Sequence, residues 1–477
     1  MRKRKLKLGF APTRRKVFSK EEAGRQRKLI LKKIKSLGGV EVVDINWLND
    51  EGLIYDISQA HEVFKKFRHE FVDAVFVPHC NFGTEDAVAK LGKELGLPLL
   101  LWGPRDDAPG PDGLRLRDTQ CGLFATSKVF RRMGVPFTYI VNSTLDDPVF
   151  ERGFKTFAAA ASAVKAFKNM RVGQVAPRPG AFWTMMVNEG ELLERFGLEV
   201  VPLTLSEIIK RTEDKVKADR KAINRDVRKI KTAVDTTSCS EESLQRMVGL
   251  KLVLKEWAEA EGLGSIALQC WTAMQEEIGI VPCFINGLLT GEGLPVTCET
   301  DIHGAMTAIL LQAVGLNERP IFFADLTIRH PQNDNAELLW HCGNFPLALK
   351  DEKSPTLACG PHFGMEGNMI GCGEFRLKEG PITVARMDGD HGEYSLLMGE
   401  GKAVAGPLSR GTYIWAEFGN WPLWEEHVVR GPYVHHVAGI HGNFAPALYE
   451  ACRYIPGLKP DPVEPSETEI QKWLRGQ

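Results

Sequence analysis

The stretch PVTCETDIHGAMTAILLQAVGLNERPIFFADL (residues 295–326) decides the fold that we expect. It contains two short apolar segments typical of β-strands, with a helix-like segment between them, and Glu299 and Asp325 each follow one of the apolar segments. If the strands are parallel neighbours joined by the helix, they form one β–α–β unit. Both acids then lie at the carboxyl edge of the sheet, where open α/β sheets bind ligands.

The two acids are therefore expected to lie close together. Neighbouring strands are separated by about 4.8 Å, so both carboxylates can reach one small object. Two bare carboxylates at that distance repel each other, and one of them takes up a proton unless a divalent cation lies between them. The alternative is a structural role, because strand-end acids are common in α/β proteins and Thr300 or Asp301 can cap the following helix.

The composition is that of a globular protein, and it excludes several classes of partner. The 477 residues exceed what one core supports and predict two to four domains. Because 60 basic residues nearly balance 61 acidic ones, the charge favours neither nucleic acid nor an anionic membrane. No apolar run approaches the roughly 20 residues of a membrane span, and the basic start lacks the apolar core of a secretion signal. The ten scattered cysteines favour a reduced, cytoplasmic protein.

Strand and helix patterns alternate over the first two thirds of the chain, which predicts two doubly wound α/β domains. We expect an N-terminal α/β domain over residues 1–170 and a second one over 171–318, with a helical hairpin at 206–262. From 319 to 477, glycine-punctuated strands predict an antiparallel β-rich, barrel-like domain with a closing helix. No G-x-G-x-x-G motif follows the first strand, so a dinucleotide-binding domain is not supported.

Histidines gather in the part of the chain that follows Glu299, which contains nine of the twelve. His341 follows an apolar strand in LLWHCGN, and GPYVHHVAGIHGNF supplies His435 and His436. Each histidine alone is more often a structural residue. Together with the pair of strand-end acids, they indicate a metal site with oxygen and nitrogen ligands. Such a site suits Mn²⁺, Mg²⁺, Co²⁺ or Fe²⁺ better than a closed structural zinc site.

These segments resemble the L-fucose isomerase and L-arabinose isomerase superfamily of aldose–ketose isomerases. CETDIHGAMTAILLQ followed by FFAD resembles the paired acid segments of the fucose isomerases. LLWHCGN resembles the strand that carries a histidine ligand in the arabinose isomerases, and HHVAGIHGNF resembles the C-terminal histidine segment of the whole group. The resemblance covers most of the chain, which is most similar to the compact L-fucose isomerase-like relatives.

The resemblance implies roles for individual residues. Glu299 and Asp325 would be metal ligands and also the catalytic acid/base pair. His436 would be a third ligand, and His341 a further ligand by the arabinose isomerase pattern only. His435 would then face the substrate. The resemblance also implies Mn²⁺, or Mg²⁺ or Co²⁺, as the metal and no organic cofactor.

The chemistry of an aldose–ketose isomerase fits these residues. The reaction moves a proton between C1 and C2 through an ene-diol(ate). Two carboxylates suffice if one removes the carbon proton and the other moves a hydroxyl proton. A hydride shift is the competing mechanism. The expected substrate is a free, non-phosphorylated sugar, and L-fucose, D-arabinose, L-arabinose and an anionic C6-modified hexose such as sulfoquinovose remain open.

Two other classes of function are alternatives. A sugar-binding or regulatory protein without catalysis would also have tandem α/β domains. A metallohydrolase would usually have denser Asp/His motifs and a glycine-rich phosphate loop, neither of which the sequence contains. The acid pair and the histidines favour the isomerase.

Three residues of the first predicted domain are candidates for substrate binding. Arg14 and Arg15 follow the first predicted strand, where they can hold a sugar or an anion, and exposed arginines without a function are the alternative. Trp102 follows a later strand, where its ring can stack on a sugar face. The resemblance implies that this domain closes the active site of a neighbouring subunit. It therefore implies a homo-oligomer, either a hexamer or one built from trimers.

Overall fold

The structure of the chain is a computed structural model that describes residues 5–270, 272–352, 360–361 and 370–477. It divides into two compact units. The N-terminal unit extends to Lys165 and also contains Tyr449–Ile455 and Glu467–Gln477, whereas the main unit consists of Ala166–Leu448 and Pro456–Ser466. The predicted domain boundaries after residues 170 and 318 stay predictions. None of the described helices is long and apolar enough to cross a membrane.

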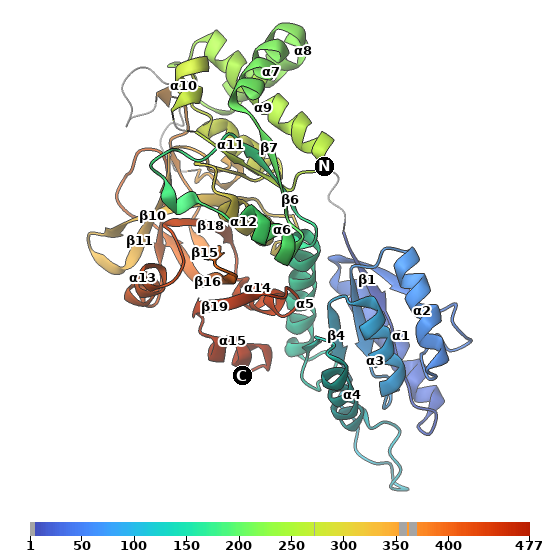
Figure 1. Cartoon of the computed structure of the whole chain (residues 1–477). Helices are drawn as coiled ribbons and strands as arrows, with labels where there is room; N and C mark the ends of the chain where they lie inside the picture. Colours follow the sequence, from blue (N-terminus) through green and yellow to red (C-terminus); the bar gives the residue numbers. More distant parts are fainter. Residues whose placement is uncertain (1–4, 271, 353–359, 362–369) are drawn as a thin grey trace. The chain divides into compact units, whose positions relative to one another are not determined.

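A five-stranded parallel sheet forms the centre of the N-terminal unit, in the order β2-β1-β3-β4-β5 (Figure 1). Its strands are β1 (Leu6–Phe10), β2 (Val40–Asp44), β3 (Ala74–Pro78), β4 (Leu99–Trp102) and β5 (Thr138–Tyr139). The helices of this unit include α1 (Lys20–Leu37), α2 (Ser58–His69), α3 (Glu85–Leu95), α4 (Thr119–Met133), α5 (Pro148–Phe167) and α15 (Glu467–Leu474). Val75 and Val77 enter one apolar core, whereas Ala74 and Phe76 enter another. Both faces of the sheet are therefore buried, as the unbroken apolar strands require.

A second parallel sheet lies in the main unit, in the order β7-β6-β8-β9. Its strands are β6 (Arg171–Val175), β7 (Glu199–Leu203), β8 (Ser265–Leu268) and β9 (Val296–Thr297). The helices that accompany it are α6 (Glu189–Phe196), α7 (Leu205–Ala218), α8 (Arg220–Ala233), α9 (Glu241–Glu261), α10 (Ala273–Ile278), α11 (Cys283–Gly291) and α12 (Ile302–Val314). Short 3-10 turns lie at Trp183–Met185 and Leu347–Leu349.

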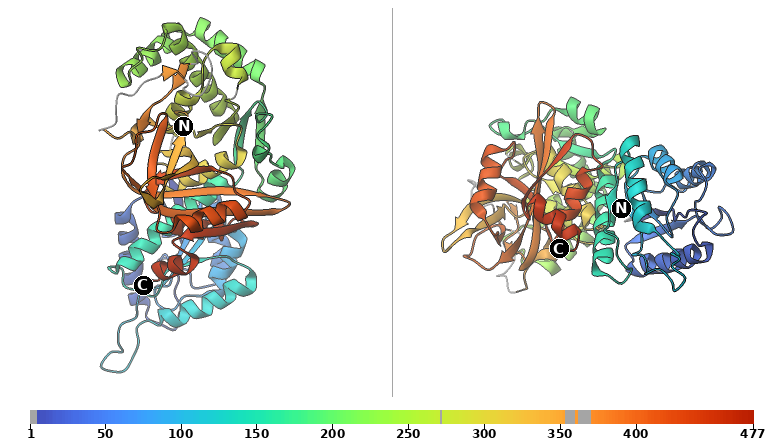
Figure 2. Two further views of the ribbon diagram at one scale, coloured as in Figure 1. Left: turned by 90° about the vertical axis from the view of Figure 1, so that its left-hand side faces the viewer. Right: turned by 90° about the horizontal axis from the view of Figure 1, so that it is seen from below.

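Residues 206–262 form three helices, so the predicted helical hairpin is wrong. The side chain of Asp219 accepts a hydrogen bond from the backbone N–H of Ala222 and so caps α8 directly after α7 ends. Ser240 caps α9 in the same way. These two caps divide the charged stretch of residues 206–262 into three helices. Helices α7, α8 and α9 gather at one end of the main unit (Figures 1 and 2).

Six antiparallel strands of the main unit form a closed ring, drawn in colours from yellow-orange to red in Figure 2. Their order is β17-β11-β10-β18-β15-β16, and β16 pairs again with β17. The six are β10 (Ile321–His330), β11 (Asn333–His341), β15 (Gly380–Asp390), β16 (Glu393–Val404), β17 (Thr412–Glu417) and β18 (His436–His441). Strands β14 (Phe375–Arg376) and β19 (Leu458–Glu464) add to the ring in parallel. Two parallel sheets and this mixed sheet confirm the predicted mixed α/β class.

The remaining elements are short. Strands β12 (Gly360–Pro361) and β13 (Ile370–Cys372) form a separate pair. Helix α13 (Trp421–Arg430) follows β17, and α14 (Ala445–Cys452) follows β18.

The prediction that the strands before Glu299 and Asp325 are parallel neighbours is wrong. Glu299 follows β9 of the parallel sheet, whereas Asp325 lies within β10, which pairs antiparallel with β11 and β18 in the ring. The helix between them, α12, is buried on nearly all sides and packs against β8, β15 and β18. Its sequence is apolar all round because it lies between two sheets, and it therefore carries the chain from one sheet to the other.

Candidate functional site

Three of the predicted site residues lie on adjacent strands of the ring. Asp325 in β10 and His436, the first residue of β18, are directly opposite each other in an antiparallel pair. His341 is the last residue of β11, the strand on the other side of β10. The ring of Phe323 packs against both imidazoles, with centroids 5.9 Å from that of His341 and 5.1 Å from that of His436. The strands therefore hold the Asp325 carboxylate between two histidines, and the ring of Phe323 packs against both imidazoles.

Glu299 reaches the same place from the other sheet through a strained turn. Glu299 and Thr300 have φ angles of 53° and 58°, in the left-handed region that side chains with a Cβ rarely adopt. Two such residues in succession, one of them β-branched, are costly and persist only where the surrounding structure imposes them. Asp301 then begins α12 by accepting a hydrogen bond from the backbone N–H of Gly304 at 2.8 Å, as predicted for a helix cap. The turn aims the Glu299 carboxylate at the ring.

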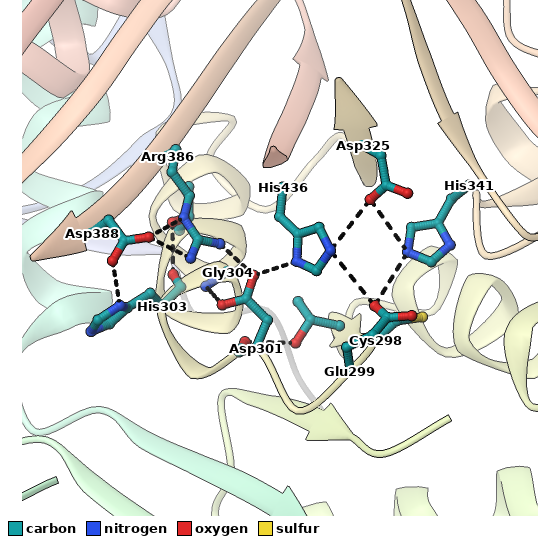
Figure 3. Close-up of polar contacts among 12 residues, drawn as sticks. Cys298, Glu299, Asp301, His303, Gly304, Asp325, His341, Arg386, Asp388 and His436 are labelled. Carbon is teal, nitrogen blue, oxygen red and sulfur yellow. Dashed lines mark hydrogen bonds and ion pairs between the residues drawn. The ribbon is translucent and has the colours of Figure 1, made fainter. Parts of the chain in front are cut away.

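Four side-chain atoms from these residues face one another (Figure 3). His436 Nε2 lies 3.4 Å from Asp325 Oδ1 and 3.7 Å from Glu299 Oε2. His341 Nε2 lies 3.8 Å from Glu299 Oε2 and 4.0 Å from Asp325 Oδ1. The structure thus brings together the two acids and two of the histidines that the sequence singled out.

The buried atoms of this group fit a cation. Glu299 Oε2 and Asp325 Oδ1 are shielded from solvent and form no hydrogen bond within the described part of the chain. Buried polar atoms without a partner are costly and call for an unseen one. Ligand atoms about 2.1 Å from one metal ion lie about 3.0–3.4 Å apart for octahedral or tetrahedral geometry. The separations of His436 Nε2 from the two carboxylates, 3.4 and 3.7 Å, are close to this range.

Without a cation, Glu299 prefers to hold a proton. It is 5% exposed, and its burial raises the pKa of the carboxyl to about 7. For His436, burial opposes protonation, but the hydrogen bond to Asp301 and the charge of Asp325 outweigh it and raise the pKa. The site therefore holds protons when it holds no cation, and a cation that binds between these groups would replace them.

His436 is oriented by an ionic network that sequence reasoning missed. Its Nδ1 lies 2.9 Å from Asp301 Oδ2, which makes Nδ1–H the donor and leaves the lone pair on Nε2. Asp301 also pairs with Arg386, which is 1% exposed and binds Asp388 through Nε at 2.9 Å and Nη2 at 2.6 Å. Although burial opposes ionisation, Arg386 and His436 hold the pKa of Asp301 well below its usual range. A carboxylate that stays ionised fixes the His436 tautomer (Figure 3).

His341 is held in a different way. Its Nδ1 accepts a hydrogen bond from the backbone N–H of Cys342 at 2.8 Å. In the neutral ring the proton therefore lies on Nε2, the atom that faces Glu299 and Asp325. The two histidines thus present opposite groups to the same carboxylates: His436 presents a lone pair, and His341 presents an N–H.

The other predicted residues lie in varied surroundings. His435 is exposed, and it offers a ligand atom within 4.8 Å of those of Asp325 and His436. In the N-terminal unit, Arg14 is buried and its guanidinium binds Glu51 at 2.6 and 2.8 Å. Arg15 pairs with Glu85 at 2.7 Å and lies over the ring of Phe82.

Trp102 is fully buried, and its indole donates a hydrogen bond to Ser143 Oγ at 3.1 Å. Its ring centroid lies 4.5 Å from that of Phe150. The neighbours of Trp102 within the N-terminal unit favour a core role over the predicted stacking on a sugar.

Comparison with known proteins identifies relatives over most of the chain. A family model for the N-terminal domain of fucose/sulfoquinovose isomerases matches residues 9–168. A sulfoquinovose isomerase from Priestia aryabhattai is 24% identical over 452 residues, which cover 94% of this chain and 97% of that protein. A sulfoquinovose isomerase from Alkalicoccus urumqiensis is 26% identical over 337 residues, 70% of this chain and 73% of that protein.

Solved structures add little. A periplasmic solute-binding protein from Actinobacillus succinogenes 130z with bound D-allose shares 13% identity and a TM-score of 0.18, covering 66% of this chain and 94% of that one. This score carries no argument about the fold. The isomerase relatives, in contrast, confirm the resemblance inferred from the acid and histidine segments and the prediction of an enzyme. The chain is therefore similar to L-fucose isomerase-like sugar isomerases, and this similarity indicates an isomerase, an intramolecular oxidoreductase that acts on sugars.

Proposed function

We propose that the protein is a metal-dependent aldose–ketose isomerase whose substrate is sulfoquinovose. The observation that carries the proposal is that His436 Nε2 faces both carboxylates. It lies 3.7 Å from Glu299 Oε2 and 3.4 Å from Asp325 Oδ1. Oxygen and imidazole ligands in this number suit Mn²⁺, Mg²⁺ or Co²⁺.

We assign Glu299, Asp325 and His436 as the ligands. His341 was predicted as a fourth ligand, but with its Nδ1 occupied by the Cys342 N–H it faces the carboxylates as a hydrogen-bond donor. A cation held by these ligands would act as a Lewis acid that polarises the sugar carbonyl and acidifies the C–H of the neighbouring carbon. The Nε2–H group of His341 would then stabilise the negative charge of Glu299 and Asp325 electrostatically during proton transfer.

Glu299 and Asp325 are the groups that move protons. The Glu299 carboxylate is buried in the site, where it can accept a proton from the sugar carbon and return it. Asp325 is more accessible, with 17% of its side chain exposed. We propose Glu299 as the base at the carbon and Asp325 as the group that moves the hydroxyl proton, with an ene-diol between the two steps.

The relatives suggest a sugar with a sulfonate group, and the main unit offers a cation for it. Thr300 Oγ1 donates a hydrogen bond to Pro177 O at 3.3 Å, which brings the loop after β6 beside the Glu299 turn. The next residue, Arg178, is half-buried, donates to the carbonyls of Pro179 and Gly180, and pairs with no carboxylate among the described residues. A guanidinium without an acidic partner suits a sulfonate.

Arg14, Arg15 and His435 remain candidates for further substrate contacts in this proposal. The first two would act in a homo-oligomer, hexameric or built from trimers, in which the N-terminal unit of one subunit closes the site of another. Both arginines pair with a glutamate, but 34% of the Arg15 side chain is exposed against 7% for Arg14, so Arg15 is the more accessible of the two.

The test uses metal-stripped protein with Mn²⁺, Mg²⁺ or Co²⁺ in D₂O. Sulfoquinovose, L-fucose, L-arabinose and D-arabinose are supplied in turn, and NMR follows ketose formation and deuterium at C2 of the recovered aldose. We expect metal-dependent turnover of sulfoquinovose, with deuterium uptake that supports the ene-diol route. Arg178→Met should raise KM for sulfoquinovose about tenfold or more and leave turnover of any neutral sugar unchanged. Turnover of neutral sugars alone would refute the substrate proposal, and absence of any turnover would refute the function.

A further inference from the structure

The second oxygen of Glu299 faces a group of sulfur atoms. Cys270, just after β8, donates a hydrogen bond from Sγ to Glu299 Oε1 at 3.1 Å. The ligand atoms of Cys270, Cys298 and Glu299 all lie within 4.8 Å of one another, and all three residues are buried. Glu299 Oε2 meanwhile faces His341 and His436. The carboxylate therefore stands between two different sets of ligand atoms.

Two amides point at the sulfur of Cys298. Asn286 Nδ2 in α11 and Asn344 Nδ2 after β11 lie 3.7 and 3.5 Å from Cys298 Sγ and donate to it. Both asparagines are at most 2% exposed, and neither side-chain oxygen has a hydrogen-bond partner among the described residues. N–H donors of this kind stabilise the negative charge of a metal-bound sulfur and fix its direction. A buried thiol that serves only as an apolar core group has no need of two amide donors.

We propose that Cys270, Cys298 and Glu299 Oε1 form a second cation site, which takes a thiophilic divalent ion such as Zn²⁺ or Cd²⁺. Two sulfurs and one carboxylate oxygen are ligands that these soft ions prefer over Mn²⁺ or Mg²⁺. On binding, each thiol that coordinates the ion releases its proton to solvent.

The second site would oppose the first because the two share Glu299. This part of the inference rests on the proposed function, whereas the binding itself does not. A cation bound at Glu299 Oε1 reduces the negative charge on Glu299 Oε2, which faces the first site. It also repels a cation in that first site. A soft ion should therefore weaken Mn²⁺ binding without occupying the Mn²⁺ position.

The binding is tested by titrating the metal-stripped, reduced full chain with Cd²⁺ and recording the ultraviolet thiolate-to-cadmium charge-transfer band. We expect a saturating band in the wild type, its loss in both Cys270→Ala and Cys298→Ala, and its retention in Cys452→Ala. Cys452 is a matched control because it is a buried thiol outside the group. Thermal melts establish that each variant is folded. A wild type without the band, or a band that both variants keep, overturns the site.

The opposition is tested by electron paramagnetic resonance of free Mn²⁺ with and without one equivalent of Cd²⁺. We expect Cd²⁺ to weaken Mn²⁺ binding about tenfold or more in the wild type and to leave it unchanged in Cys298→Ala. Equal weakening in both would mean direct displacement and would overturn the opposition. If the wild type binds no Mn²⁺, the proposed function fails, and the charge-transfer band still decides the thiol site.

Discussion

His436 and His341 flank the same strand and face the same two carboxylates, yet the two sides of the site are built differently. On the His436 side, Asp301 receives the Nδ1 proton and is itself held by Arg386. On the His341 side, the backbone N–H of Cys342 occupies Nδ1, and the thiols of Cys298 and Cys342 lie near the ring. Residue type and distance alone would make both imidazoles ligands. The partner of the remote nitrogen decides which of them has a lone pair to offer.

The largest expected effect comes from removing either of the two carboxylates that both histidines face, Glu299 and Asp325. Glu299→Gln and Asp325→Asn keep the size of the side chains but remove the charge and the proton acceptor. We expect turnover to fall by about 10³-fold or more in each, since general acid/base groups contribute about 10²–10⁴-fold and the cation is also weakened. Steady-state rates with saturating Mn²⁺ measure this. A variant within tenfold of wild type would remove its residue from the mechanism.

The ionic network behind His436 is expected to matter for stability. Arg386→Met leaves the buried carboxylates of Asp301 and Asp388 without their cation, which should cost about 3–5 kcal/mol in the free energy of unfolding. Arg430→Met is the matched control because the Arg430 side chain is 79% exposed and its pair with Glu426 should contribute about 1 kcal/mol or less. Urea unfolding measures both. Equal losses in the two variants would contradict the network's role.

The two histidines themselves are distinguished by metal affinity. His436→Asn should weaken Mn²⁺ binding by about 100-fold or more, because it removes a ligand, whereas His341→Asn should weaken it by less than about tenfold. Equilibrium titration of each metal-stripped variant gives the two dissociation constants. Losses of similar size would show that His341 is a fourth ligand after all, as the arabinose isomerase pattern implies.

The metal-free protein should lose stability as the pH rises. The pKa of Glu299 is raised to about 7, so the stability that this group contributes is present below its ordinary value of 4.5 and is lost as the pH rises through about 7. The raised pKa of His436 acts with the same sign, since its contribution is present below 6.5 and is lost at higher pH. The metal-free protein should therefore melt at a lower temperature at about pH 8 than at about pH 6, and Mn²⁺ should reverse the loss.

The mutation Glu299→Gln supplies the control for this pH dependence. A neutral amide cannot titrate, so melting temperatures of this variant with a chelator present should vary less between the two pH values than those of the wild type. A metal-free wild type that is equally stable at both would contradict the proton-loaded state of the site.

The sequence predicted which residues meet but not how they are brought together. Glu299, Asp325, His341 and His436 were singled out because two strand-end acids occur together with a strand-end histidine and a pair of adjacent histidines. The strands before Glu299 and Asp325 are not parallel neighbours, because α12 links two different sheets. The sequence of α12 is apolar on all sides, which already indicated a helix buried between two layers.

Arg386 and Asp388 were missed because GPITVARMDGD was interpreted only as a strand. Charged residues two apart in a strand lie on the same face. Opposite charges at that spacing within apolar surroundings were the available signal for an internal ion pair. The hydrogen bond from the Cys342 backbone to His341 carries no sequence signal, because any residue at 342 other than proline would supply the N–H.

The most direct test of the central claim is pulsed electron paramagnetic resonance of Mn²⁺ bound to the metal-stripped protein, which detects nitrogen nuclei coordinated to the ion. The account predicts one saturable Mn²⁺ per chain with coupling to a single imidazole nitrogen, and loss of that coupling in His436→Asn but not in His341→Asn. Saturable Mn²⁺ without nitrogen coupling, or no saturable Mn²⁺, would contradict it.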